Sequence, residues 1–109
     1  DKKRIVLKLD PKIAPITCAV LPLVKKDGLL EIAQKIVEDI RTKYSAFFDQ
    51  GGSIGRRYRR QDEAGTPYGI TVDHQTTEDG TVTLRDRDTM DQVRISTDNI
   101  LSELQSRIQ

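Results

Sequence analysis

The sequence predicts one α/β domain with a mixed five-stranded sheet and three helices. Three observations support this fold class: an uninterrupted apolar run near residue 20, helical spacing of apolar residues in later segments, and alternation of apolar and polar residues in the second half. The chain has 109 residues, of which 36% are hydrophobic and 32% charged, as is ordinary for one globular domain. It contains no apolar run near the roughly 20 residues that a membrane-spanning helix needs.

The first half is expected to form a strand, a helix and a second strand. Residues 17–24 are almost continuously apolar, which is typical of a strand buried on both faces. From about 28 to 44, apolar residues recur at helical spacing and charged residues fill the opposite side, so a helix is expected there. Residues 45–49 predict the next short strand, which is followed by Gln50-Gly51-Gly52.

The second half is expected to begin with a helix and to continue with strands. Ser53 is a natural N-cap for a helix through about Ala64. Gly65 suits the position after that helix, and Pro67 prevents its continuation. Three more strands and a last helix are expected over 68–72, 81–84 and 92–95 and from about 97 onward. Two right-handed crossovers should make the first three strands parallel, and the later tight turns should make the other two antiparallel.

The charges of the chain are divided unevenly. Residues 1–60 hold 14 Lys and Arg against 7 Asp and Glu, whereas residues 61–109 hold 4 against 10. The formal net charge of +1 does not reveal this asymmetry, because the two parts nearly cancel. The asymmetry indicates a charged partner. Residues 1–12 are basic and carry a short apolar arm, so we interpret them as an arm and linker that belong to something upstream. Residues 13–109 are then the domain proper.

The most unusual stretch is Arg56-Arg57-Tyr58-Arg59-Arg60, with four arginines in five residues. It is either a solvated helix face with local ion pairs or a site that recognises phosphates or bases. The second reading rests on the forked guanidinium, which fits phosphates and base edges better than an ammonium does.

A second charged stretch, Arg85-Asp86-Arg87-Asp88, alternates cations and anions at the end of an expected strand. It is either a self-neutralising turn or a base-reading segment. Base reading would use both charges, because an arginine donates two parallel hydrogen bonds while a carboxylate accepts from an exocyclic amine.

No catalytic centre and no metal site is predicted. The single cysteine, Cys18, lies in the expected buried strand and excludes both an internal disulfide and a cysteine-based zinc site. The single histidine, His74, has neither a nearby cysteine nor a serine-centred nucleophile motif. The glycine-rich residues 51–55 lack the Gly-Lys-Ser/Thr ending of a nucleotide-binding loop. The chain is therefore not expected to be a complete enzyme.

Three stretches carry a family resemblance: 52–63 (GSIGRRYRRQDE), 65–67 (GTP) and 81–90 (TVTLRDRDTM). They resemble the C-terminal anticodon-binding domain of glycyl-tRNA synthetase, a class II aminoacyl-tRNA synthetase, and the resemblance covers roughly residues 13–108. It implies the anticodon-binding fold of class II synthetases, a five-stranded mixed sheet with three helices. This agrees with the element order above.

The resemblance also implies a function. The parent protein would join glycine to its tRNA using ATP and Mg²⁺, in the cytoplasm and usually as a homodimer. Residues 1–12 would be the tail of an absent catalytic domain, which would be this domain's partner in the same chain. The fragment itself would bind the anticodon loop of tRNA(Gly), would need no cofactor, would not contact a membrane, and would catalyse nothing alone.

Nine residues become candidate RNA contacts. By resemblance to sister synthetases, the anticodon contacts are Arg59, Thr76 and Arg85. Asp86, Arg87, Asp88 and Glu63 are further candidates for base reading, and Arg56 and Arg60 could contact phosphates or pack against the catalytic domain.

Two other functions fit the same fold. One is an accessory module of a DNA polymerase, because the accessory subunit of the mitochondrial enzyme has a similar terminal domain. The other is a protein-docking module in which the arginine-rich helix never meets RNA.

Overall fold

The computed structural model describes residues 17–24, 26, 28–49 and 65–108. In chain order, the elements are β1 (Cys18–Pro22), α1 (Leu29–Ile40), β2 (Ala46–Phe48), β3 (Tyr68–Val72), α3 (His74–Asp79), β4 (Thr81–Asp86), β5 (Gln92–Ser96), the 3₁₀ turn η1 (Thr97–Asn99) and α4 (Ile100–Ile108). The helix expected over 53–64 and the arm expected over 1–12 lie outside the described residues.

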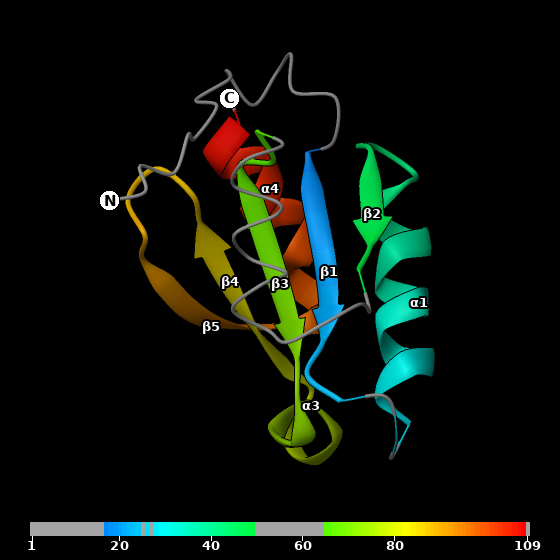
Figure 1. Ribbon diagram of the computed structural model, residues 1–109. Coiled ribbons are helices and arrows are strands. Elements are labelled where there is room, and N and C mark those ends of the chain that lie inside the picture. Colours follow the sequence, from blue (N-terminus) through cyan, green and yellow to red (C-terminus); the bar gives the residue numbers. More distant parts are fainter. Residues whose placement is uncertain (1–16, 25, 27, 50–64, 109) are drawn as a thin grey trace, which may run out of the picture.

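One mixed sheet organises the fold, with the strand order β2-β1-β3-β4-β5 (Figure 1). β1 pairs in parallel with both β2 and β3, whereas β3 with β4 and β4 with β5 are antiparallel. The predicted fold class, a mixed five-stranded sheet in an α/β domain, is confirmed, as are the strand directions.

The main core lies on one face of this sheet, beneath α1 and α4. Alternate residues of the central strands point toward it, as the two-residue period of a strand requires. The strands contribute Cys18, Val20, Tyr68, Ile70, Val72, Val82 and Leu84, and the helices contribute Leu29, Ala33, Ile36, Val37, Ile40, Ile100 and Leu104. Figure 1 shows α4 behind the sheet, close to β1 and β3.

The opposite face becomes polar toward the β5 edge. On β1 it carries Ala19 and Leu21, both with no exposed surface. Directly opposed residues then form two rows across β3, β4 and β5, which we call the polar rows. One row is Thr71, Thr83 and Arg94, and the other is Gly69, Arg85 and Gln92.

Two local features differ from the expectation. α1 ends at Ile40 rather than near residue 44, and residues 41–44 form turns instead. Arg41 donates from Nε and Nη2 to the Ala46 carbonyl at 3.2 and 3.1 Å, which ties this turn to the start of β2. The short helix α3 was not predicted at all.

Local capping explains α3. Asp73 is its N-cap and Thr76 completes a reciprocal capping box, while Gly80 closes its C-terminus at φ 72°. A glycine takes this left-handed conformation without the strain that a Cβ would add. The helices of the described part are all too short or too polar to cross a membrane.

Candidate nucleic-acid interface

Arg85 lies near the end of β4 and is 7% exposed. Its Nη2 donates to Sδ of Met90 at 3.3 Å, a contact with the turn that follows the strand. In its polar row it lies between Gly69 on β3, which has no side chain, and the exposed Gln92 on β5. Arg85 is thus a largely buried guanidinium near the end of the strand, and the exposed Gln92 amide lies beside it on β5.

Arg87 is even more buried, at 4% exposed, and holds the fold together. Its Nη1 donates to the Gly65 carbonyl at 2.8 Å, and its backbone N–H donates to the Pro67 carbonyl at 2.8 Å. Alternation along a continuous strand would place Arg85 and Arg87 on the same face. β4 ends at Asp86, however, so Arg87 lies in the turn and anchors the segment before β3.

The two aspartates of this stretch differ in their surroundings. Asp86 Oδ1 accepts from the backbone N–H groups of Asp88 and Thr89 at 2.8 and 3.2 Å, so this carboxylate shapes the turn. Its Oδ2 lies 3.9 Å from Nη1 of Arg107 on α4. The Asp88 carboxylate pairs with Arg87 at 3.0 Å, yet its side chain remains 49% exposed. Of the two carboxylates, that of Asp88 is more accessible to an outside donor.

Thr76 lies on α3 and is 5% exposed. Its backbone N–H and Oγ1 donate to Oδ1 of Asp73 at 3.3 and 3.2 Å, and its Oγ1 accepts from the Asp73 N–H at 3.1 Å. Thr76 and Arg85 lie beyond opposite ends of β4, since α3 precedes the strand and Arg85 is near its end. From Thr81 to Arg85 the strand spans about 13 Å, so the structure does not bring these two candidates together.

Four of the candidate residues fall outside the described part of the chain. They are Arg56, Arg59, Arg60 and Glu63.

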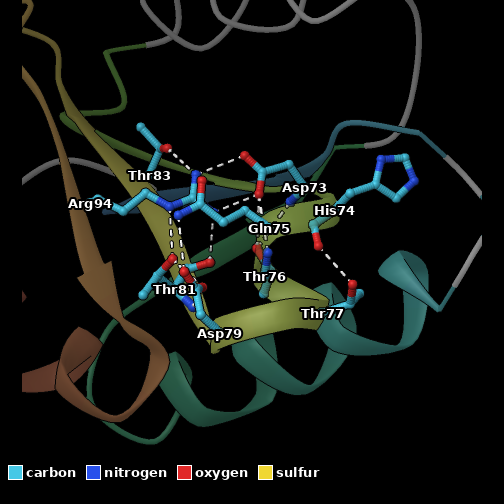
Figure 2. A network of polar contacts seen from close by, with 9 residues as sticks. All are labelled: Asp73, His74, Gln75, Thr76, Thr77, Asp79, Thr81, Thr83 and Arg94. Atoms are coloured by element: carbon cyan, nitrogen blue, oxygen red, sulfur yellow. Dashed lines mark hydrogen bonds and ion pairs between the residues drawn. The ribbon is translucent and has the colours of Figure 1, made fainter.

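A polar network centred on Arg94 was not anticipated from the sequence (Figure 2). Arg94 Nη1 and Nη2 donate to Oδ2 and Oδ1 of Asp73 at 2.8 and 2.6 Å, a bidentate ion pair. The same side chain donates to Oγ1 of Thr81 at 2.8 Å, to Oγ1 of Thr83 at 3.0 Å and to the Thr81 carbonyl at 3.1 Å. Arg94 on β5 therefore ties the start of α3 to the first half of β4.

The network also sets the charge state of its carboxylates. The Arg94 hydrogen bond is the main reason why the pKa of Asp73 falls from its ordinary 3.8 to about 2, although partial burial opposes the shift. The same pair raises the pKa of Arg94. Hydrogen bonds from Thr81 and Gln75 lower the pKa of Asp79 at the end of α3. Asp73 and Arg94 are thus both charged at neutral pH.

The described residues hold no cluster of three or more His, Cys, Asp or Glu side chains able to bind a metal ion. Cys18 is fully buried, and burial raises the pKa of its thiol, so a thiolate is disfavoured there. His74 is exposed on α3, where its carbonyl accepts from Oγ1 of Thr77 at 2.7 Å. The described geometry is that of a sheet face with two rows of polar residues beside a charged turn.

Comparison with known proteins shows the family to which the chain belongs. Residues 17–107 match the family described as "Anticodon binding domain". The match runs from β1 to all but the last residue of α4, and the chain belongs to this family of anticodon-binding domains.

Relatives with names narrow the resemblance further. The chain is 58% identical over 105 residues to the glycine–tRNA ligase of Rhodopirellula baltica, covering 96% of this chain and 20% of the relative. It is 53% identical over 108 residues to the glycine–tRNA ligase of Treponema denticola, covering 99% and 24%. It is 56% identical over 110 residues to that of Methanothrix thermoacetophila, covering 97% and 19%. The resemblance predicted from the motifs is confirmed, and the chain spans about a fifth to a quarter of these relatives.

Proposed function

We propose that this chain is the anticodon-binding part of a glycine–tRNA ligase and that it binds the anticodon loop of tRNA(Gly). The observation that carries the proposal is a sequence identity of 53–58%, over nearly the whole chain, to proteins named glycine–tRNA ligase. This similarity favours tRNA binding over a protein-docking module or a DNA polymerase accessory module.

The chemistry of the target suits the β4–β5 hairpin. Glycine anticodons share two adjacent cytosines, and a cytosine offers an amino donor beside two acceptors. A reader therefore needs a cationic or amide donor and a carboxylate or carbonyl acceptor, presented where bases are unstacked. Arg85 and Gln92 supply donors on one sheet face, and the exposed Asp88 carboxylate supplies an acceptor in the adjoining turn.

The other candidate residues are assigned roles from the resemblance and, where the structure describes them, from their contacts. Arg59, Thr76 and Glu63 are proposed as further anticodon contacts, and Arg56 and Arg60 as contacts to phosphates or to the rest of the protein. Asp86 and Arg87 are proposed to act on RNA through the shape of the hairpin, because their side chains bond the turn and the Gly65 carbonyl. Since Thr76 and Arg85 flank opposite ends of β4, they would meet different nucleotides.

The remaining assignments concern the longer protein. Residues 13–109 would form the tRNA-binding domain, and residues 1–12 would lead from a catalytic part that precedes it. That part would bind ATP and Mg²⁺ and join glycine to tRNA, in the cytoplasm and as a homodimer. This chain alone would catalyse nothing.

A titration tests the proposal directly. The chain is added to a fluorescently labelled glycine anticodon stem-loop, and to a stem-loop in which the two adjacent cytosines are replaced, at several salt concentrations. Tighter binding of the cytosine loop, with a salt slope set by the phosphate contacts, is expected. Equal affinities that fall steeply with salt would leave only a nonspecific basic surface, and no binding to either by folded protein would favour a docking module.

A further inference from the structure

Asp86 holds the turn between β4 and β5 together. Its backbone N–H donates to the Asp91 carbonyl at 2.9 Å, and its own carbonyl accepts from the Met90 N–H at 2.8 Å. Oδ1 of its side chain accepts from the N–H groups of Asp88 and Thr89 at 2.8 and 3.2 Å. Four hydrogen bonds of one residue therefore set the course of the chain through this turn.

The second oxygen of the Asp86 carboxylate approaches a helix of the other layer. Oδ2 lies 3.9 Å from Nη1 of Arg107 in the last turn of α4, and the side chains of Arg107 and Asp86 are only 29% and 19% exposed. Arg107 also pairs with Glu103 on its own helix, at 3.4 Å from Nε. In Figure 1, the C-terminal end of α4 lies at the same end of the sheet as the start of β3. The pair thus links the helical layer to the turn that follows β4.

Tyr68 is a third member of this cluster. It lies directly opposite Asp86 in the register of β3 against β4 and is 5% exposed. Burial is the main reason why the pKa of Tyr68 is raised; the charge of Asp86 raises it further, and the charge of Arg107 lowers it. The phenol, the carboxylate and the guanidinium are therefore within electrostatic reach of one another, at the end of the sheet where the turn begins.

The helix itself does not account for the place of Arg107. A cation in the last turn of a helix interacts favourably with the helix dipole, and a pair with a residue four positions earlier adds to this effect. A side chain that extends into solvent obtains both contributions. Arg107 instead has most of its side chain buried and its Nη1 directed toward Asp86.

We infer that Arg107 is a positioning residue for base reading and that it acts through Asp86 and the turn. This inference rests on the proposed function, since the turn carries the exposed Asp88 carboxylate that is proposed to accept from a cytosine. Oδ1 of Asp86 holds the Asp88 backbone N–H, while Oδ2 pairs with Arg107. The cation thus fixes the rotation of the Asp86 carboxylate, and that carboxylate fixes the place of Asp88. Arg107 itself contacts no base.

Amide hydrogen exchange, measured by NMR, tests the positioning in the chain without RNA. Arg107→Met keeps the stem of the side chain and removes its charge. Without the cation, the Asp86 carboxylate should rotate more freely. Exchange at the Asp88 and Thr89 N–H groups should then speed up by on the order of twofold to fivefold, the effect that a part-exposed ion pair can have. The buried amides of β1 are the reference and should not change. Unchanged exchange at both turn amides overturns the inference.

The preference between the two stem-loops tests what this positioning serves. In Arg107→Met, the ratio of dissociation constants for the cytosine-replaced and two-cytosine loops should fall by the same factor of about two to five at an unchanged salt slope. The Tm should fall by less than about 5 °C. Arg107→Lys keeps a cation within reach of Asp86 and should retain most of the preference. The matched control is Glu103→Gln, which removes the other partner of Arg107 and should leave the ratio unchanged.

The outcomes separate this inference from the function on which it rests. If the folded parent chain binds neither stem-loop, the proposed function fails and the inference fails with it. If the parent chain prefers the two-cytosine loop and Arg107→Met keeps that preference, only the inference fails. Equal weakening of both loops with a smaller salt slope would make Arg107 a phosphate contact and overturn the positioning role. Arg107→Lys no better than Arg107→Met would also contradict it, since the positive charge would then not matter.

Discussion

Replacing Arg94 by methionine should destabilise the domain far more than removing the exposed Lys35–Asp39 ion pair does. The substitution keeps the length and the apolar stem of the side chain but removes the guanidinium. Five hydrogen bonds are lost, two to the Asp73 carboxylate and three to Thr81 and Thr83. Asp73 then keeps only its bonds to the first turn of α3.

The expected magnitude follows from burial. The Arg94 and Asp73 side chains are 28% and 23% exposed, so the pair lies between the exposed and the buried case. Exposed pairs contribute about 0.2–1 kcal/mol, whereas breaking a buried pair costs about 3–5 kcal/mol. An intermediate loss of about 2–3 kcal/mol is therefore expected, which lowers the Tm of a domain of this size by on the order of 10 °C.

Urea unfolding followed by circular dichroism measures this loss, with Lys35→Met as the matched control. The Lys35–Asp39 pair is 3.6 Å long, and its side chains are 74% and 59% exposed, so its removal should cost less than about 0.5 kcal/mol. Asp73→Asn completes a double-mutant cycle, because asparagine caps a helix as well as aspartate does and so isolates the ion pair. An Arg94→Met loss no larger than that of Lys35→Met would refute the reasoning.

Five further outcomes are expected. Because the pKa of Asp73 is lowered to about 2, its share of stability is full above about pH 4 and is lost as the pH falls toward 2; Asp73→Asn should lack this loss in acid unfolding curves. In Arg94→Met, the pKa of Asp73, followed by carboxyl NMR, should return toward its ordinary value. Arg85→Ala should weaken binding of the two-cytosine loop by about 1–3 kcal/mol, and an equal loss for the replaced loop would leave a phosphate role instead. Arg87→Ala should mainly lower the free energy of unfolding, by about 1–3 kcal/mol, since the Gly65 carbonyl loses a donor. Cys18 should react with thiol reagents only upon unfolding, and rapid modification of native protein would contradict its burial.

The sheet could be predicted because its signals are local. The apolar run of β1 and the alternation in β4 each lie within a few consecutive residues, and crossover handedness then fixes the strand directions. α3 could not be predicted in the same way. Its six residues are polar and show no helical periodicity, and its start depends on Arg94, which lies 21 residues beyond Asp73.

The candidate site shows the same difference between local signals, which the sequence reveals, and long-range contacts, which it does not. The sequence indicated that Arg85 and Arg87 matter, because opposite charges alternate around them. It could not indicate that Arg87 is bound to the Gly65 carbonyl, 22 residues earlier, because that contact exists only once β3 and β4 pair. The positive φ of Met90, 65°, was equally invisible, since the geometry of this turn is set by the register of β4 against β5.

The central claim is that the β4–β5 hairpin reads cytosine. It is tested most directly by how much Arg85 contributes to the preference for the two-cytosine stem-loop. The measurement is the ratio of dissociation constants for the cytosine-replaced and two-cytosine stem-loops, taken at one salt concentration for the parent chain and for Arg85→Ala. A base-reading arginine predicts a ratio of about ten or more in the parent chain, which falls toward one in the variant. A ratio near one in the parent chain, or a ratio that survives in folded Arg85→Ala, would contradict the claim.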